Sequence, residues 1–164
     1  MNNLFVRSGA RFSSCGKYRY GLFRERDEGN GEVNFIMLNP STADAETNDP
    51  TVERCQRRAW VMGYKRVTVT NLFALRSTDP QKLYKDEDPV GSENDYWLVM
   101  AAAEATIVIC AWGLHGNYRG RGEEVRDMLR ANGAKLYYLR LSKAGIPTHP
   151  LYLPYSEGPQ LWIS

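Results

Sequence analysis

The feature that most constrains the fold of this chain is the order in which strand-like and helix-like segments follow one another. Four short runs are rich in apolar and β-branched residues, as in strands covered on both faces; they occupy residues 32–38, 66–70, 106–111 and 135–139. Three helix patterns separate them, at residues 49–62, 92–105 and 123–132. This alternation predicts a parallel sheet with right-handed crossovers and helices on both faces. We therefore expect a three-layer α/β/α fold around a central, mainly parallel sheet of about four strands.

Local signals mark where the predicted helices begin and end. Asp49 is expected to cap the free amides of the first helix, and Pro50 suits its first position. Gly63 follows the last residue of that helix, and Ser92 is expected to cap the second one. These residues set the boundaries between the strand and helix patterns.

Both ends of the chain extend this pattern. Residues 17–26 roughly alternate aromatic or apolar with charged side chains, which predicts an antiparallel strand with one solvent-facing side. One or two such strands are expected at the N-terminal edge of the sheet. The segment from Ser142 onward is rich in proline and glycine and is expected to wrap the surface. The 164 residues contain no repeat or long linker, so a single domain over residues 1–164 is predicted.

Composition limits the partners and the compartment. The chain has 21 Lys and Arg against 19 Asp and Glu, and a net charge of +2 does not favour nucleic acid by bulk charge, although a local patch stays possible. Three widely spaced cysteines indicate reduced thiols in a cytoplasmic protein. With two histidines and no close cysteine pair, neither a metal nor another cofactor is expected. Glu104 interrupts the apolar stretch at residues 96–114, and no apolar signal segment precedes Arg7, so no membrane segment is predicted.

Polar and aromatic residues follow all four predicted parallel strands. Ligands of open α/β sheets bind at the carboxyl ends of the strands, so these segments are expected to converge. They are residues 39–44, 71–73, 112–119 and, further along, 142–149. Such a set suits a planar polar ligand such as a nucleobase, because amides read its edge, a ring stacks on its face and a histidine supports developing charge.

Each of these residues also has a purely structural interpretation. Asn39 can shape a turn with the proline that follows it, and Asn71 can cap the next segment. His149 can be a satisfied loop histidine, and Trp112 can be a core residue. The joint position of these residues at one sheet edge is what favours a site.

Two further segments allow the same choice between structure and function. Asp44 and Asp49 can both serve only as helix or turn caps. Residues 118–122 are a solvated loop or, alternatively, a phosphate contact. Neither GxGxxG nor GxxxxGK[ST] is present, and there is no G-x-S-x-G elbow, so no phosphate-loop or serine-hydrolase mechanism is predicted.

Six segments of the chain resemble the signature of domain-of-unknown-function family 1643, a bacterial and phage family. They are Phe35–Asp44 (FIMLNPSTAD), Asn48–Thr51, Asn71–Ala74, Thr78–Pro80, Ala111–Gly113 and His149–Tyr152. The resemblance covers nearly the whole chain and rests on long, specific motifs. The family name implies no activity.

A more distant resemblance does imply an activity. The order strand–Asn-Pro, strand–Asn, strand–Gly, strand–His-Pro is similar to that of the uracil-DNA glycosylase superfamily. It implies that Asn39, with Pro40 and Ser41, positions or activates a water at the sugar C1′. It also implies that Asn71 reads the base edge, and that His149 stabilises the departing base anion and touches the DNA backbone.

The chain departs from the superfamily pattern at three places. Ser41 stands where the superfamily has a glycine, and Leu151 stands where it has a serine. The base-stacking aromatic residue is missing at its usual close spacing, so Phe73 or Trp112 would have to serve. The resemblance nevertheless implies a uracil-DNA glycosylase-like fold.

The candidate site residues fall into three groups by expected role. The expected catalytic residues are Asn39, Asp44 and His149. The expected base-binding or ligand-binding residues are Pro40, Ser41, Thr42, Asn71, Phe73, Trp112 and Gly113. The expected contacts to a nucleic-acid backbone are Arg119, Arg121 and Lys143.

Three functions remain as hypotheses from the sequence. The first is an N-glycosidase-like enzyme that recognises a base in DNA or in a nucleotide and hydrolyses the bond to its sugar. The second is a non-catalytic binder of a nucleotide or modified base. The third is a protein-interaction factor that pairs a partner with an aromatic-rich edge strand at residues 18–23.

Overall fold

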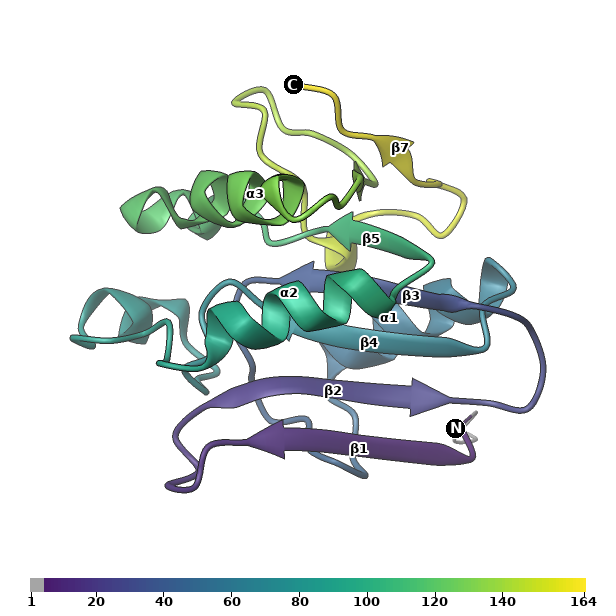
Figure 1. Ribbon diagram of the computed structural model, residues 1–164, viewed down its shortest axis with the longest axis horizontal. Coiled ribbons are helices and arrows are strands. Elements are labelled where there is room, and N and C mark those ends of the chain that lie inside the picture. Colours follow the sequence, from purple (N-terminus) through teal and green to yellow (C-terminus); the bar gives the residue numbers. More distant parts are fainter. Residues whose placement is uncertain (1–4) are drawn as a thin grey trace.

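The strands of the chain form one mixed sheet, which Figure 1 shows in ribbon form. The computed structural model describes residues 5–164, and within them the sheet has seven strands. The strands are β1 (Arg7–Phe12), β2 (Arg19–Glu25), β3 (Glu32–Met37), β4 (Arg66–Asn71), β5 (Ile107–Cys110), β6 (Leu136–Tyr138) and β7 (Gln160–Leu161). Their order across the sheet is β1-β2-β4-β3-β5-β6-β7.

The middle of the sheet is parallel, as predicted. β3 pairs with β4 on one side and with β5 on the other, and β6 continues the parallel part beyond β5. After β3 the chain adds β4 on one side of β3, and it then crosses to the other side to add β5 and β6. In folds of this type, the point where the strand order reverses is where ligands bind, outside the carboxyl ends of the strands.

The sheet is larger than the sequence predicts, because antiparallel strands extend it at both edges. β1 and β2 lie at one edge, and β7 pairs with β6 at the other. β7 has two residues, too few for any alternation to be recognised in the sequence. β2 pairs with both β1 and β4, so it is not an edge strand, and the predicted docking of a partner strand along residues 18–23 has to be corrected.

The helices begin close to where the sequence places them. They are α1 (Pro50–Val61), α2 (Asn94–Glu104) and α3 (Arg121–Ala131), with the short 3₁₀ helices η1 (Pro80–Tyr84), η2 (Leu114–Gly120) and η3 (Pro150–Tyr152). Asp49 caps α1 as predicted, because its Oδ1 accepts a hydrogen bond from the Val52 amide at 2.9 Å. Ser92 does not cap α2, which has Glu93 at its N-cap without a side-chain hydrogen bond.

Two apolar clusters hold the helices to the sheet. Val33, Phe35 and Met37 of β3 pack in one cluster together with residues of α1. Ile36 of β3 packs in the other cluster together with residues of α2 and α3. Successive side chains of a strand point to opposite sides of a sheet, so the two clusters use opposite sides of β3.

Other expectations from composition can be compared with the described part of the chain. Within residues 5–164, no helix combines the length and the apolar character needed to span a bilayer. Cys15 is exposed, whereas Cys55 and Cys110 are buried, and all three are free thiols. Burial raises the pKa of the Cys55 thiol to about 12, which keeps it protonated at neutral pH.

Candidate functional site

A pocket of about 730 Å³ lies at the carboxyl ends of the parallel strands. The segments that follow β3, β4, β5 and β6 all contribute to its lining, together with the first turn of α1. This volume is within the range of small-molecule sites in proteins. The pocket therefore occupies the place that the topology of the sheet predicts for a ligand.

Asn39 lies in this pocket with its amide group held in one orientation. Its Nδ2 donates hydrogen bonds to the carbonyl oxygens of Pro40, Leu75 and Ser77, at 3.1, 3.3 and 3.0 Å. Because three carbonyl oxygens surround the amide, its NH₂ group rather than its oxygen must face them. Asn39 Oδ1 accepts no hydrogen bond from residues 5–164 and is left as an acceptor for a ligand.

His149 lines the same pocket and has one of its ring nitrogens occupied. Its Nδ1 accepts a hydrogen bond from the Leu151 amide at 3.1 Å, where His149 caps η3. Burial lowers the pKa of His149 to about 4, although the nearby Asp49 carboxylate opposes this effect. The imidazole is therefore neutral at pH 7, with its proton on Nε2. Nε2 makes no hydrogen bond within the described chain and is free to donate to a ligand.

Asp49 is the carboxylate of the pocket lining, and backbone amides hold both of its oxygens. Oδ1 accepts from the Val52 amide at 2.9 Å, and Oδ2 accepts from the Ala43 amide at 3.1 Å. The side chain is 6 % exposed. Asp49 thus joins the start of α1 to the loop that follows β3 and places one negative charge at the pocket.

Hydroxyl groups supply most of the remaining polar lining. Ser41, Thr51, Thr78 and Thr148 line the pocket, and none of their side chains is hydrogen-bonded to any residue between 5 and 164. The Ser142 hydroxyl accepts from the Ile146 amide at 3.2 Å and keeps its own proton for donation. The pocket therefore offers several neutral donors and acceptors without partners.

Two buried arginines of β2, Arg19 and Arg24, hold the loop between β3 and α1. Arg19 donates to the Ala43 carbonyl at 3.0 Å, and burial lowers its pKa to about 10. Arg24 donates to the carbonyl oxygens of Asp44 and Thr47, at 2.6 and 3.2 Å, and to Asn48 Oδ1 at 2.9 Å. Their charged side chains replace the backbone partners that this loop lacks, and so they position Asn39 and Ser41 at the pocket.

Two arginines of α1 hold the segment that carries His149. Arg54 donates to the Pro150 and Leu153 carbonyl oxygens, at 3.3 and 2.7 Å. Arg58 also donates to the Leu153 carbonyl oxygen, at 2.7 Å, and both guanidinium groups lie over the Tyr155 ring. The predicted surface tail is therefore tied to α1, which stabilises one wall of the pocket.

The residues expected in catalysis divide between the pocket and the loop behind it. Asn39 and His149 line the pocket, and Asp44 does not. Asp44 is exposed, and its Oδ1 accepts from the amides of Glu46 and Thr47 at 2.9 and 2.8 Å. These backbone hydrogen bonds lower the pKa of Asp44 and show that it shapes a turn. Asp44 therefore lies outside the pocket lining, and its expected catalytic role stays a prediction.

The residues expected to bind the ligand also divide. Ser41, Trp112 and Gly113 line the pocket, whereas Pro40 is buried behind it and Thr42 is exposed outside it. A Cβ atom at Gly116 would lie 2.1 Å from Trp112 Cδ1, so the indole is packed tightly into the core and presents only part of its surface. Gly113 has φ of +81°, a conformation that favours glycine.

Asn71 and Phe73 are not part of the pocket lining. Asn71 is 1 % exposed, and its Oδ1 accepts from Arg19 Nη2 at 3.4 Å. Its backbone carbonyl oxygen accepts from Asn94 Nδ2 at 2.9 Å. Phe73 is fully buried in the cluster with α2 and α3 and contacts the Tyr118 ring. The expected base-reading role of Asn71 and the stacking role of Phe73 are therefore corrected.

The three expected backbone contacts differ in accessibility. Arg121 is 2 % exposed and donates to the Leu72 carbonyl oxygen at 2.9 Å. It also pairs with Asp95 and Glu124, both at 2.6 Å, so it has no free donor face for phosphate. Arg119 and Lys143 are exposed beyond the pocket lining, and their contact with nucleic acid stays a prediction.

Several residues of the pocket lining are not among the candidate site residues of the sequence. Thr51, Ser77, Thr78, Thr148 and Tyr152 line it. His115 lines it too, with its Nδ1 2.8 Å from the Tyr84 hydroxyl. The one available signal was position, because these residues lie in the loops and first turns that follow the parallel strands. Hydroxyl residues are common in such loops, and their type alone does not indicate a site.

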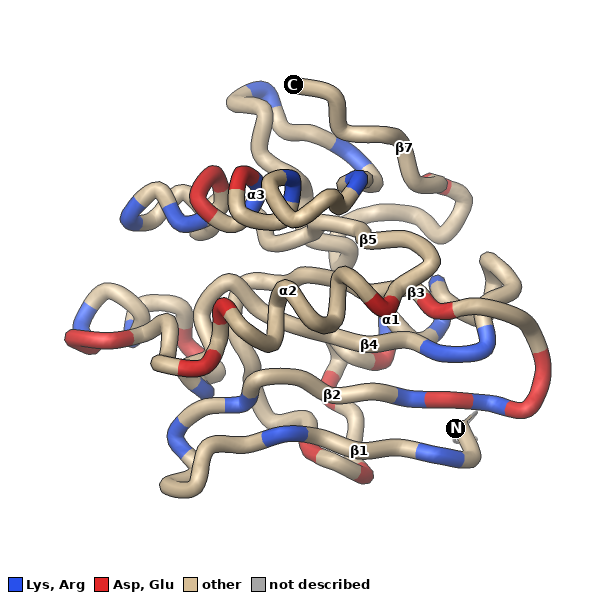
Figure 2. Tube along the Cα trace, viewed as in Figure 1, with Lys and Arg blue, Asp and Glu red and all other residues tan. Residues whose placement is uncertain are grey.

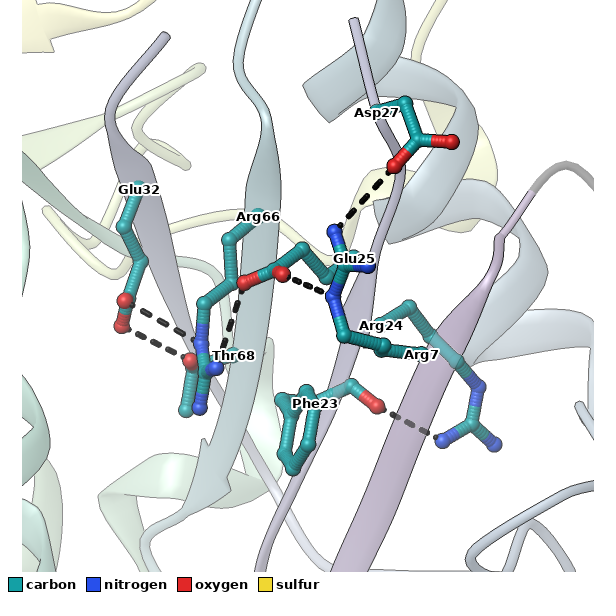
Figure 3. Close-up of polar contacts among 8 residues, drawn as sticks. All are labelled: Arg7, Phe23, Arg24, Glu25, Asp27, Glu32, Arg66 and Thr68. Carbon is teal, nitrogen blue, oxygen red and sulfur yellow. Dashed lines mark hydrogen bonds and ion pairs between the residues drawn. The ribbon is translucent and has the colours of Figure 1, made fainter.

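The amino ends of the same strands have a different character (Figures 2 and 3). Figure 2 shows Lys and Arg beside Asp and Glu at the ends of β1, β2 and β4. Figure 3 shows Arg66 between two carboxylates, with its Nη1 3.4 Å from Glu25 and its Nε 3.2 Å from Glu32. Arg7 pairs with Glu25 and with Asp27. Arg7, Arg66 and their acidic partners at this end are therefore paired with one another.

The fold and the pocket together define a class of protein. It is an α/β protein with a pocket of small-molecule size outside the carboxyl ends of the parallel strands of a mixed sheet. Residues 19–151 match the family model described as "Protein of unknown function (DUF1643)", and the chain belongs to this family. The match extends from the first residue of β2 into η3 and includes every lining residue named above except Tyr152. No curated protein and no solved structure matches the chain.

Proposed function

We propose that the pocket recognises a nucleobase. The observation that carries this proposal is the pairing of two groups with fixed and opposite hydrogen-bonding roles in one pocket. Asn39 presents an acceptor oxygen, and His149 presents an N–H donor. Every nucleobase has donors and acceptors side by side along its edge, which such a pair can read. Apolar residues of the pocket lining, Leu114 and Leu151 among them, supply apolar surface for the ring.

The distant resemblance to the uracil-DNA glycosylase superfamily is the reason to choose a nucleobase over other planar polar ligands. The two apolar clusters on opposite sides of β3 support the three-layer arrangement that this resemblance implies. The Asn-Pro and His-Pro motifs of the resemblance both contribute lining residues to the pocket. A cytoplasmic location remains part of the proposal, since free thiols suit a reducing compartment.

Hydrolysis of an N-glycosidic bond is a second candidate, favoured by the state of His149. A neutral imidazole that donates from Nε2 can stabilise a base that departs as an anion. Asp49 is the pocket carboxylate that can orient the attacking water, in place of Asp44. A water molecule would attack the sugar C1′ as the C1′–N bond breaks. The electron pair of the C1′–N bond would leave with the base. The proton that the water loses would be held by Asp49 and end on the departing base.

Calorimetric titration with free bases, nucleosides, nucleotides and short oligonucleotides tests the recognition proposal. Wild-type protein is expected to bind at least one of them, and His149→Ala is expected to weaken binding about tenfold to a hundredfold through the lost hydrogen bond. His149→Asn removes the Nε2 donor as well but keeps an acceptor for the Leu151 amide, so it separates ligand binding from loop stability. Glu25→Gln, at the other end of the sheet, is the control for unchanged affinity.

Failure of all four ligand classes to bind the wild-type protein would reject nucleobase recognition. The hydrolysis candidate has a separate test, single turnover on nucleosides and on oligonucleotides that carry uracil or other altered bases. Release of free base that Asp49→Asn slows is the expected result. Binding without any release of base rejects hydrolysis and leaves the protein as a non-catalytic binder.

A further inference from the structure

We infer that the pocket takes an uncharged nucleoside, a base with its sugar, rather than a nucleotide whose phosphate enters the pocket. This inference rests on the proposed recognition of a nucleobase and adds the class of ligand. It follows from the charges at the pocket, from the state of the α1 N-terminus and from the hydroxyl groups of the lining.

The charges at the pocket oppose a phosphate group. No Lys or Arg is among the described residues that line the pocket, and Asp49 adds a negative charge to the lining. The buried Arg19 and the half-buried Arg54 have guanidinium groups that donate to the carbonyl oxygens of residues 43, 150 and 153. Sites that hold phosphate supply cationic side chains or free amides, and this pocket supplies no cationic side chain.

The N-terminus of α1 reaches the pocket but is closed to an anion. Helix N-termini bind phosphate through their free amides and their dipole. Here Pro50 has no amide hydrogen, and the Asp49 carboxylate accepts from the Val52 amide. A negative side chain therefore already occupies the position that a phosphate would take.

The neutral polar groups of the pocket suit a sugar. The unpartnered hydroxyls of Ser41, Thr51, Thr78 and Thr148 can each donate and accept one or more hydrogen bonds. Sugar hydroxyls have the same dual capacity, so the two sets are complementary. Asn39 and His149 then remain for the base, and the pocket of about 730 Å³ has room for both parts of a nucleoside.

Calorimetric titration of the full chain with matched nucleosides and 5′-monophosphates tests the inference. Each nucleoside that binds is expected to bind at least tenfold more tightly than its monophosphate. Equal or tighter binding of the monophosphate overturns the inference while leaving nucleobase recognition intact. Binding of none of the ligands rejects the proposed function itself, so the two failures are distinguishable.

A base in DNA presents the same hydrogen-bonding groups as the base of a free nucleoside. Titration with an oligonucleotide shows whether the ligand is a free nucleoside or a base within DNA. A short single strand that carries the preferred base is expected to bind more weakly than the nucleoside. Tighter, salt-dependent binding of the strand, weakened by Lys143→Ala, would identify DNA as the source and overturn the inference in favour of an extruded base.

Two variants test the electrostatic reason for the selection. Asp49→Asn is expected to narrow the ratio of nucleoside to monophosphate affinity severalfold, since the repelling charge is removed. Asp79→Asn is the matched control, because Asp79 precedes Pro80 and caps η1 outside the pocket lining, and it is expected to leave the ratio unchanged. Thr51→Lys adds a cation to the pocket and leaves the Asp49 cap in place, so it is also expected to narrow the ratio. A ratio of nucleoside to monophosphate affinity that is unchanged in both Asp49→Asn and Thr51→Lys contradicts the electrostatic explanation.

Discussion

The two ends of the parallel strands differ in whether their polar side chains are bonded to one another. At the amino ends, Glu32, Arg66 and Glu25 bind one another across β3, β4 and β2 (Figure 3). At the carboxyl ends, Asn39 and His149 keep one polar atom each without a partner. Both atoms belong to residues that line the pocket, where a ligand can bond to them. We therefore propose the carboxyl ends as the end of the sheet that binds a ligand.

Two uses of arginine can be distinguished on the two sides of β2. Arg24 and Glu25 are neighbours on β2, so their side chains lie on opposite sides of the sheet. Figure 3 shows the Arg24 guanidinium directed away from the chain of ion pairs. Arg24 is 0 % exposed and binds the loop that frames the pocket, whereas Arg7 lies at the surface. Exposed ion pairs contribute little to stability, whereas removing a buried charged group is strongly destabilising because its buried partners lose their hydrogen bonds.

The largest effect is expected from removing the buried arginine behind the pocket. Arg24→Met leaves the Asp44 carbonyl oxygen and Asn48 Oδ1 without their donor, and the Thr47 carbonyl oxygen loses one of its two donors. We expect a loss of about 3–5 kcal/mol in the free energy of unfolding. Urea denaturation measures it, and Arg7→Met is the matched control with an almost unchanged midpoint. Equal losses in the two variants would contradict the division between the two sides of β2.

An intermediate effect is expected from pH. The pKa of His149 is about 4 in the folded protein and about 6.5 when unfolded, so the unfolded chain binds more protons between these values. Stability from the neutral imidazole is therefore complete above about pH 6.5 and is lost as the pH falls toward 4, by about 2–3 kcal/mol.

The His149→Asn variant isolates this loss from the titration of carboxylates. Its asparagine keeps an acceptor for the Leu151 amide but does not titrate. Urea denaturation at several pH values is expected to show wild type falling relative to the variant between pH 6.5 and 4. Parallel pH profiles of the two proteins would show that His149 titrates normally and is not held neutral by burial.

The smallest effect is expected at the amino ends. Burial raises the pKa of Glu32 despite its hydrogen bond from Thr68 and its pairing with Arg66. The cost of burying this carboxylate therefore exceeds what its partners return at neutral pH. Glu32→Gln is expected to leave stability equal or to raise it by less than about 1 kcal/mol, with ligand affinity unchanged. A clear destabilisation at pH 7 would show that the paired end contributes more than the comparison allows.

The fold could be predicted from the sequence because its signals are local. β3 is mostly apolar, β5 is a continuous apolar run, and Asp49 with Pro50 marks the start of α1. β7 could not be predicted, because two residues form no pattern and the strand exists only through its pairing with β6. The resemblance to the family's motifs was equally local, and the family match confirms it.

The site could be predicted only in part, because the loops are fixed by distant residues. Asn39 and His149 follow from the rule that parallel strands place their carboxyl ends together. Asn71 ends its strand in the same way, yet Arg19, which lies 52 positions earlier, binds its side chain in the interior. Arg121 sits in a glycine-rich stretch that looks solvated, but Asp95 of α2 binds it in a buried position. Contacts of this kind have no signature in a local pattern.

A crystal structure of the protein soaked with the nucleoside that binds best tests the central claim most directly. We predict the base in the pocket at the carboxyl ends, with one of its acceptors bonded to His149 Nε2 and an N–H of the base bonded to Asn39 Oδ1. A nucleoside bound at the amino ends, or one in the pocket with both atoms left to water, would contradict it.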